Sequence, residues 1–407
     1  MVKRDTAQER MTPKERMLRA LAGEKSDVLP AAPCYPGLFL ADFERAFYVE
    51  QYRTRLRECD ANRYPVDHEE DTVFRLRARV QSYGIFKVRP DWIEMGRGAS
   101  RAWAERTAIV EEDGVLYYQD LATGKRAAMH RAPLPRGDAE LSEENPSETD
   151  VWDVSDQIRD DDDVDRLIPI PSREQLLASG HLDVMRQAVD IYGGQYFMST
   201  ILDTPFSYVS DLLGFYGLMT IQHDRPKLLH YMLQRQLAQT QEVMAALAAV
   251  GLHGVYVEEV FTSADLISPR AYDEFVFAYN QPFFRYMRNV GLLPIHYACG
   301  DILPRLESMI ECDVAAVAVE ESKKNFRIEI EEVVERVAGR AAVFGNIDAV
   351  KFGLGATMDE MAAEVKRQAR IGARANGFVV STGSPFPLDT NPRLIDALVS
   401  TAHSLPG

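Results

Sequence analysis

Short apolar runs alternate with amphipathic stretches through the second half of the chain. The runs are apolar at nearly every position, at residues 196–202, 254–259, 293–299, 315–320, 341–345 and 377–382. Continuous apolar runs of this kind are typical of parallel strands that are covered on both faces. The stretches around them show helical spacing, at residues 184–192, 206–250, 268–290, 303–311, 330–338, 358–371 and 392–404. Regular alternation of strand and helix predicts a parallel sheet with crossover connections.

The first part of the chain departs from this rhythm. Thr12, Pro13 and Glu15 predict the start of a helix that ends at Gly23, and the apolar run 31–40 predicts a first buried strand. Residues 95–135 predict a β excursion from the main fold, because Asp113-Gly114 is a hairpin-turn pair between two apolar segments. The acidic residues 136–165 predict a solvated linker or surface arm.

Polar residues recur at the end of nearly every predicted strand. An eight-stranded barrel builds its active site from such strand ends, whereas an open dinucleotide-binding sheet needs an early GxGxxG motif that this sequence lacks. We therefore predict one domain over residues 1–407, with the fold of a (β/α)8 TIM barrel that carries an N-terminal extension.

Composition and charge narrow the classes of partner. The chain has 407 residues, 46% of them hydrophobic, and a formal net charge of -16. Such an acidic surface argues against nucleic acid and anionic membranes as partners, and it leaves a small-molecule substrate and a homodimer open. Four cysteines without CxxC spacing do not form a disulfide scaffold. With no apolar leader after Met1, these features predict a cytoplasmic protein.

The segment from His296 to Asp301 carries the most specific chemistry. His296 and Cys299 end a predicted strand, and imidazole and thiolate are ligands that zinc prefers. The neighbouring strand, residues 254–259, offers Glu258 and Glu259, of which alternation sends one to the lumen and the other to the helix layer. We expect either a zinc site made of His296, Cys299 and Glu259, or a hydrogen-bonded histidine beside a buried cysteine.

Other strand ends supply further candidates. Asp203 and Tyr297 are expected to face the pocket, and Asn346 is expected either to bind a ligand or to cap the following helix. Ser381 and Ser384 belong to a hydroxyl-rich loop that is suited to hold a carboxylate or phosphate group.

Several motifs together resemble the uroporphyrinogen decarboxylase superfamily. They are Ser268-Pro269, the His296 segment, Gly345-Asn346-Ile347-Asp348 and Gly383 to Pro387, with a looser match at Thr12 to Arg16. The resemblance covers residues 190–405 well and implies a (β/α)8 barrel. The superfamily contains cofactor-free decarboxylases and zinc-dependent methyltransferases that use a corrinoid protein.

The sequence departs from both branches. Residues 32–38 lack the Arg-x-Ala-Gly-Arg motif of the decarboxylases. The methyltransferase motif His-x-Cys is one residue longer here, and Ser384 stands where the resemblance implies a second cysteine. Zinc is therefore expected on His296, Cys299 and Glu259, or not at all.

Three functional hypotheses follow. The leading one is a methyltransferase-like enzyme that works with a corrinoid protein or a methylated small molecule. The second is a metal-independent lyase for a carboxylated substrate, in which Asp203, His296 and Tyr297 stabilise a protonation step. The third, a corrinoid carrier, lacks the Asp-x-His-x-x-Gly string that such carriers use.

Overall fold

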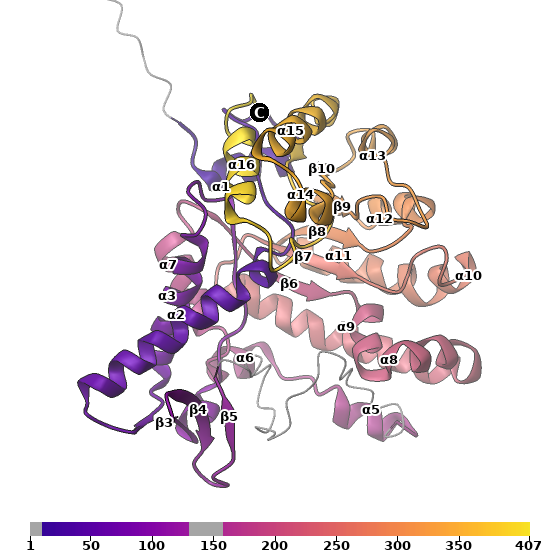
Figure 1. The fold of residues 1–407 in the computed structure, drawn as a ribbon. Coiled ribbons are helices and arrows are strands. Elements are labelled where there is room, and N and C mark those ends of the chain that lie inside the picture. The colour runs from indigo at the N-terminus through magenta and orange to yellow at the C-terminus, as the bar shows by residue number, and fades with distance from the viewer. Residues whose placement is uncertain (1–9, 130–157) are drawn as a thin grey trace, which may run out of the picture.

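A parallel sheet forms the centre of the computed structural model, which describes residues 10–129 and 158–407. The sheet has seven strands in the order β11-β10-β9-β8-β7-β6-β2, and every neighbouring pair is parallel. Its strands are β2 (Trp92–Glu94), β6 (Phe197–Asp203), β7 (Gly254–Glu259), β8 (Leu293–Ala298), β9 (Ala316–Val319), β10 (Ala342–Phe344) and β11 (Phe378–Val379). The curled sheet with helices around it confirms a TIM-barrel-like α/β fold (Figure 1).

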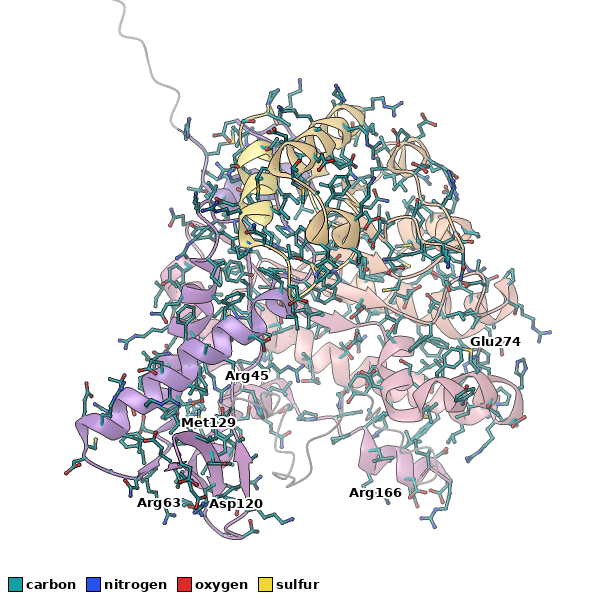
Figure 2. All side chains as sticks on the ribbon, viewed as in Figure 1. Arg45, Arg63, Asp120, Met129, Arg166 and Glu274 are labelled. Atoms are coloured by element: carbon teal, nitrogen blue, oxygen red, sulfur yellow. The ribbon has the colours of Figure 1, made fainter. Side chains whose placement is uncertain are left out.

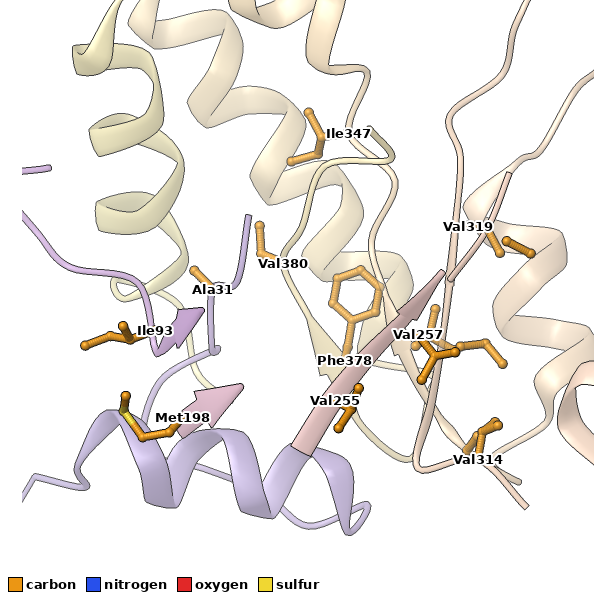
Figure 3. Close-up of a cluster of buried hydrophobic side chains, with 14 of the residues drawn as sticks. Ala31, Ile93, Met198, Val255, Val257, Val314, Val319, Ile347, Phe378 and Val380 are labelled. Carbon is orange, nitrogen blue, oxygen red and sulfur yellow. The ribbon is translucent and has the colours of Figure 1, made fainter. Parts of the chain in front are cut away.

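Residues 30–32 connect the two edges of this sheet. The Val380 N–H donates to the Pro30 carbonyl at 2.9 Å, and the Ala32 N–H donates to the Val380 carbonyl at 2.9 Å. On the other side, the Asp91 N–H donates to the Ala31 carbonyl at 2.8 Å. Ala31, Val380 and Ile93 accordingly lie close together in Figure 3.

The strand predicted over residues 31–40 is wrong beyond its first residues. Tyr35 has a left-handed backbone (φ 43°), and α2 (Pro36–Glu58) begins at the next residue. Proline fits the first turn of a helix, where its missing N–H costs nothing. A short apolar run is compatible with a buried helix as well as with a strand, and here the helix forms.

Helices cover the outside of the curled sheet. They are α7 (Asp183–Tyr192), α8 (Pro205–Asp224), α9 (Pro226–Ala249), α10 (Pro269–Ala271), η2 (Tyr272–Phe277, a π-helix), α11 (Ala278–Asn289), η3 (Leu303–Arg305), α12 (Leu306–Glu311), α13 (Ile330–Val337), α14 (Ala349–Leu354), α15 (Met358–Gly372) and α16 (Pro392–Ala402). Many begin at a capped residue, such as Thr357, whose hydroxyl and Glu360 form a capping box. The predicted first helix is confirmed as α1 (Pro13–Leu21), which contacts β2, β6 and β11.

An antiparallel lobe stands beside the barrel and confirms the predicted β excursion. It contains β1 (Arg63–Pro65), β3 (Thr107–Glu112), β4 (Val115–Asp120) and β5 (Arg126–Ala128), with α3 (His68–Tyr83) and α4 (Arg101–Glu105). Asp113 and Gly114 both have positive φ, 50° and 77°, as a tight hairpin turn requires. Arg63, Asp120 and Met129 mark this lobe in Figure 2.

Part of the predicted acidic linker is helical. Residues 136–157 lie outside the described residues, but α5 (Asp161–Leu167) follows, capped by Asp160, and precedes α6 (Arg173–Ser179). Acidic residues in a first helical turn complement the helix dipole, which the charge-run interpretation overlooked. Asp163 also bonds to Arg159 and Arg166, so this short helix is held by ion pairs.

Two separate cores lie on the two faces of the sheet. The outer core packs sheet against helices and includes Met198, Val255, Val257 and Phe378 (Figure 3). The inner core fills the lumen with Trp92, Phe197, Tyr256, Tyr297 and Phe344, among others, and Met17 of α1 belongs to it. Because neighbouring strand residues alternate between these cores, membership of either core tells which way each strand-end side chain points.

Candidate active site

Two stacked tyrosines show which side of β7 and β8 faces the lumen. The Tyr256 and Tyr297 rings lie 5.3 Å apart in the lumen, and Tyr256 is 5.5 Å from Trp92 of β2. Residues two positions further along each strand share this face, which places Glu258 and Cys299 toward the lumen. The predicted split of Glu258 and Glu259 between the two faces is thus present, with Glu258 on the inside.

His296 and Glu259 lie on the opposite, outer face. The His296 Nε2 is 3.1 Å from Glu259 Oε2, and both side chains are buried. Glu259 also accepts hydrogen bonds from Thr262 Oγ1 at 2.7 Å and from Asn280 Nδ2 of α11 at 2.5 Å. The His296 ring packs 4.5 Å from Phe284 of the same helix. The pair therefore links the sheet to α11.

Burial alone would raise the pKa of Glu259. The interaction with His296 and the hydrogen bonds from His296, Thr262 and Asn280 outweigh that effect and lower the pKa below its ordinary value. Glu259 is thus held as a carboxylate by its partners.

The structure does not bring the predicted zinc ligands together. Cys299 Sγ lies on the lumen face, 3.9 Å from Glu258 Oε1, whereas His296 and Glu259 bond to each other behind the sheet. In the described part of the chain, no group of three or more His, Cys, Asp and Glu side chains is arranged to hold a metal ion. His296 and Cys299 are three residues apart, and an odd separation sends side chains to opposite faces of a strand. These residues do not fit a zinc ion, so we derive no step through one.

Ionisable groups instead converge at the carboxyl ends of four neighbouring strands. Asp203 ends β6, Glu258 lies near the end of β7, and Cys299 and Glu320 directly follow β8 and β9. Asp203 is paired in register with Glu258, and Glu258 with Tyr297. Glu320 accepts a hydrogen bond from the Gly300 N–H at 2.8 Å. This group of residues is called the lumen cluster below.

The lumen cluster favours protonated side chains. Desolvation, reinforced by Asp211 and Glu320, raises the pKa of Glu258 despite the neighbouring Tyr35 and Cys299. Desolvation is also the main cause that raises the pKa of Glu320. The pKa of the Cys299 thiol is raised well above its ordinary value by desolvation and then by Glu258 and Glu320. The cluster can therefore hold and transfer protons, whereas Cys299 is a poor nucleophile there.

Tyrosines form the floor beneath this cluster. The Tyr35 ring lies 5.2 Å from Tyr256 and 6.0 Å from Tyr297, both edge-on. The Tyr297 hydroxyl donates to the Gly383 carbonyl at 2.8 Å, and Cys34 Sγ is 3.4 Å from the Tyr256 hydroxyl. Sequence reasoning missed Cys34, Tyr35 and Tyr256. Tyr256 lies two residues before Glu258 on the same strand, so strand alternation is the signal that could have placed both side chains on one face.

The remaining predicted residues brace the loops around the site. Asn346 Nδ2 donates to the carbonyls of Glu320 at 3.1 Å and Ile328 at 3.0 Å, so it ties down the segment after β9. Ser384 Oγ donates to Glu321 Oε1 at 2.8 Å, and the same oxygen pairs with Lys323.

Ser381 and Arg97 are two further polar residues that follow strands of the sheet. Ser381 is buried, and its hydroxyl donates to the Thr382 carbonyl at 3.2 Å. Arg97 follows β2 and is exposed, yet desolvation by the surrounding protein lowers its pKa while Tyr208 opposes that shift. This arginine is a basic group that could bind a carboxylate of the substrate in the second functional hypothesis.

Fold and site together define an α/β enzyme with a TIM-barrel-like sheet, with the lumen cluster at the carboxyl ends of its strands. The uroporphyrinogen decarboxylase (URO-D) family model matches residues 147–405, and the chain belongs to this family. The superfamily comprises decarboxylases and methyltransferases. No helix in the described ranges is long and apolar enough to cross a bilayer.

Two curated relatives and one solved structure are similar to the chain. The relatives are a uroporphyrinogen decarboxylase of Rhodococcus opacus, 26% identical over 188 residues, and one of Nocardia farcinica, 27% identical over 223 residues. These matches cover 46% and 52% of this chain and 51% and 60% of the relatives, so the chain spans about half the length of the curated relatives it matches. A methyltransferase from Methanosarcina mazei has a TM-score of 0.63 at 18% identity, over 97% of this chain and 99% of that protein. That likeness concerns the fold.

Proposed function

We propose that the chain is a methyltransferase-like enzyme that moves a methyl group between a methylated small molecule and a corrinoid protein. The observation that carries this proposal is the chemistry of the lumen. Where decarboxylases of the family use an arginine-rich motif, this chain places Cys34 and Tyr35 against Tyr256. Glu258 and Glu320 stand above them. The lumen cluster offers a polycarboxylate no basic partner, whereas it can admit a neutral or cationic methylated molecule.

The lumen residues have defined tasks in this proposal. Tyr35, Tyr256 and Tyr297 provide an apolar wall for a small substrate and exclude water. Glu258 and Glu320, with their raised pKa values, supply or accept the proton that accompanies loss of a methyl group from oxygen or sulfur. Asp203, beside Glu258 in the sheet, orients the bound molecule. His296 and Glu259 act indirectly, by fixing the ends of β7 and β8 against α11.

A corrinoid protein is the proposed partner at the mouth of the barrel. Segments that follow strand ends expose large apolar side chains, including Tyr216 after β6, Leu266 after β7 and Leu388 after β11. Exposed apolar groups gathered at the entrance of a site are typical of a surface that another protein covers. The corrinoid, carried by that partner, would supply the methyl-accepting cobalt.

Methyl transfer to free cob(I)alamin tests the proposal. The purified protein is offered a panel of methoxy, methylthio and methylamino compounds, and methylcobalamin is followed by its absorbance. We expect turnover with one class of donor and a loss of about 100-fold in Glu258→Gln, because a positioned acid or base contributes roughly 10²–10⁴ in rate. Glu307→Gln, on the exposed face of α12, is the matched control. Carbon dioxide release from a carboxylated substrate, dependent on Glu258 and without any methylcobalamin, would contradict the proposal.

A metal-independent lyase is the second candidate, and Arg97 favours it. A desolvated guanidinium at the mouth can bind one carboxylate of a substrate, and a protonated Glu258 can deliver a proton to the carbanion left by decarboxylation. Under this hypothesis Arg97→Gln raises the KM for a monocarboxylate at least tenfold. An unchanged KM would remove this candidate.

A further inference from the structure

The lumen contains more acidic groups than the described structure neutralises. Glu258 and Glu320 face the same space, and neither forms a salt bridge with any residue within 10–129 or 158–407. Glu94, on the face of β2 that carries Trp92, pairs with Arg79, but the same guanidinium also pairs with Glu44, so two carboxylates share one positive charge there. Carboxylates removed from water are costly unless a positive charge or a proton compensates them.

A second, independent observation concerns Ser199. This residue is fully buried, and its hydroxyl oxygen has no hydrogen-bond partner in the part of the chain that the structure describes. It lies midway between Phe197 and Ile201, which both belong to the inner core, so alternation directs it into the lumen. Ser199 is also in register with Glu94 on the neighbouring strand. A buried hydroxyl of this kind is free to hydrogen-bond a polar group of a molecule held in the lumen.

Aromatic side chains beneath the lumen cluster can also attract a cation. Tyr35, Tyr256 and Tyr297 contact one another, and Trp92 is 5.5 Å from Tyr256. Aromatic faces attract cations within about 6 Å, and the attraction grows when water is excluded. Tyrosine rings next to Glu258 and Glu320, which form no salt bridge in the described part of the chain, favour an organic cation over an anion.

We propose that the methyl donor bound in this lumen is a methylated ammonium compound. The inference rests on the proposed methyl transfer and names its substrate class. Glu258 and Glu320 would compensate the positive charge, the tyrosines would surround the methyl groups, and Ser199 would hydrogen-bond a polar substituent. In the reaction the C–N bond breaks and its electron pair remains on nitrogen, which leaves as a neutral amine. Cobalt(I) of the corrinoid would supply the electron pair of the new bond to carbon and would become methyl-cobalt(III). No proton moves, so for this donor Glu258 and Glu320 act as carboxylates and not as the acid or base that an oxygen or sulfur donor needs.

Choline and its neutral carbon isostere, 3,3-dimethylbutan-1-ol, test the inference directly. The two probes have the same shape and differ in one charge, and their affinities are measured by calorimetry at constant ionic strength. We expect choline to bind at least tenfold more tightly. Glu258→Gln and Glu320→Gln should each weaken choline at least fivefold without affecting the isostere, while Glu307→Gln changes neither. Ser199→Ala should weaken both probes.

The outcomes separate this inference from the proposed function. Equal affinity for the two probes, or choline binding that is unchanged in both glutamine variants, would overturn the inference, as would tighter binding of tricarballylate than of choline. Circular dichroism shows whether the variants are folded, and the isostere gives a binding readout that does not depend on charge. Charge-dependent choline binding without methylcobalamin formation would support the cation site and count against methyl transfer. Turnover of neutral donors without choline binding would support methyl transfer and overturn the cation site.

Discussion

Replacing His296 with leucine is expected to destabilise the fold while leaving the lumen intact. Glu259 would keep its hydrogen bonds from Thr262 and Asn280 but lose the partner 3.1 Å away. Removing a hydrogen-bond partner of a buried charged group typically costs about 1.5–3 kcal/mol. Because both side chains are fully buried, we place the loss near the upper end, at about 3 kcal/mol.

A double-mutant cycle makes this estimate specific. His296→Leu, Glu259→Leu and the double variant are unfolded in urea, and we expect a coupling energy of about 2 kcal/mol, since the double variant leaves no unpaired charge. The pKa of Glu259 is lowered in the folded state, so its contribution is present above the unfolded carboxyl pKa of about 4.3 and disappears as the pH falls below that value. Choline binding per folded molecule should be unchanged. If His296→Leu left stability within about 0.5 kcal/mol of the parent but abolished turnover, His296 would act in the lumen and our placement of it would be refuted.

Three further predictions concern other parts of the molecule. His253 accepts a hydrogen bond from the Met198 N–H at 2.9 Å, and desolvation together with Lys14 lowers its pKa to about 4. Since the unfolded value is about 6.5, stability should fall as the pH drops from 6.5 to 4, by about 2 kcal/mol after discounting for partial exposure. An equally steep decline in His253→Gln, measured by urea unfolding, would contradict this. Cys299, with its raised pKa, should react with iodoacetamide at least tenfold more slowly than the exposed Cys59, as peptide mass spectrometry would show. Faster labelling of Cys299 would mean that the lumen stabilises a thiolate. Tyr297→Phe removes the bond to the Gly383 carbonyl and should cost about 1 kcal/mol in thermal or urea unfolding; no loss would show that this hydroxyl bond is not formed in solution.

The sequence was sufficient for the fold class and most element positions because those depend on local pattern. Apolar runs marked β6 to β11, and the Asp113-Gly114 pair marked the hairpin, since its left-handed backbone suits few other residues. The prediction for residues 31–40 was wrong because a short apolar run fits a buried helix as well as a buried strand. Pro36 and the tertiary context decided for the helix.

The site was harder to predict because a strand with two apolar faces does not show which face is the lumen. Alternation correctly separated Glu258 from Glu259, and the same rule applied to β8 separates His296 from Cys299. Alternation alone could not tell which of the two sets of side chains faces the lumen. That choice depends on packing, in which the rings of Tyr256 and Tyr297 fill the lumen while aliphatic side chains such as Val255 and Val257 face the helices.

The contacts of residues 30–34 with the last strand have a consequence for synthesis of the protein. The Cys34 N–H bonds to the Thr382 hydroxyl, 348 positions further along the chain. Chains are made from the N-terminus, and domains generally fold as they emerge from the ribosome. Here residues 30–34 must wait, with their apolar side chains unpaired, until the segment around residues 380–382 has been translated. A ribosome that stalls before residue 380 would therefore hold an open sheet with two unpaired edges, a state that invites aggregation and that chaperones would have to protect.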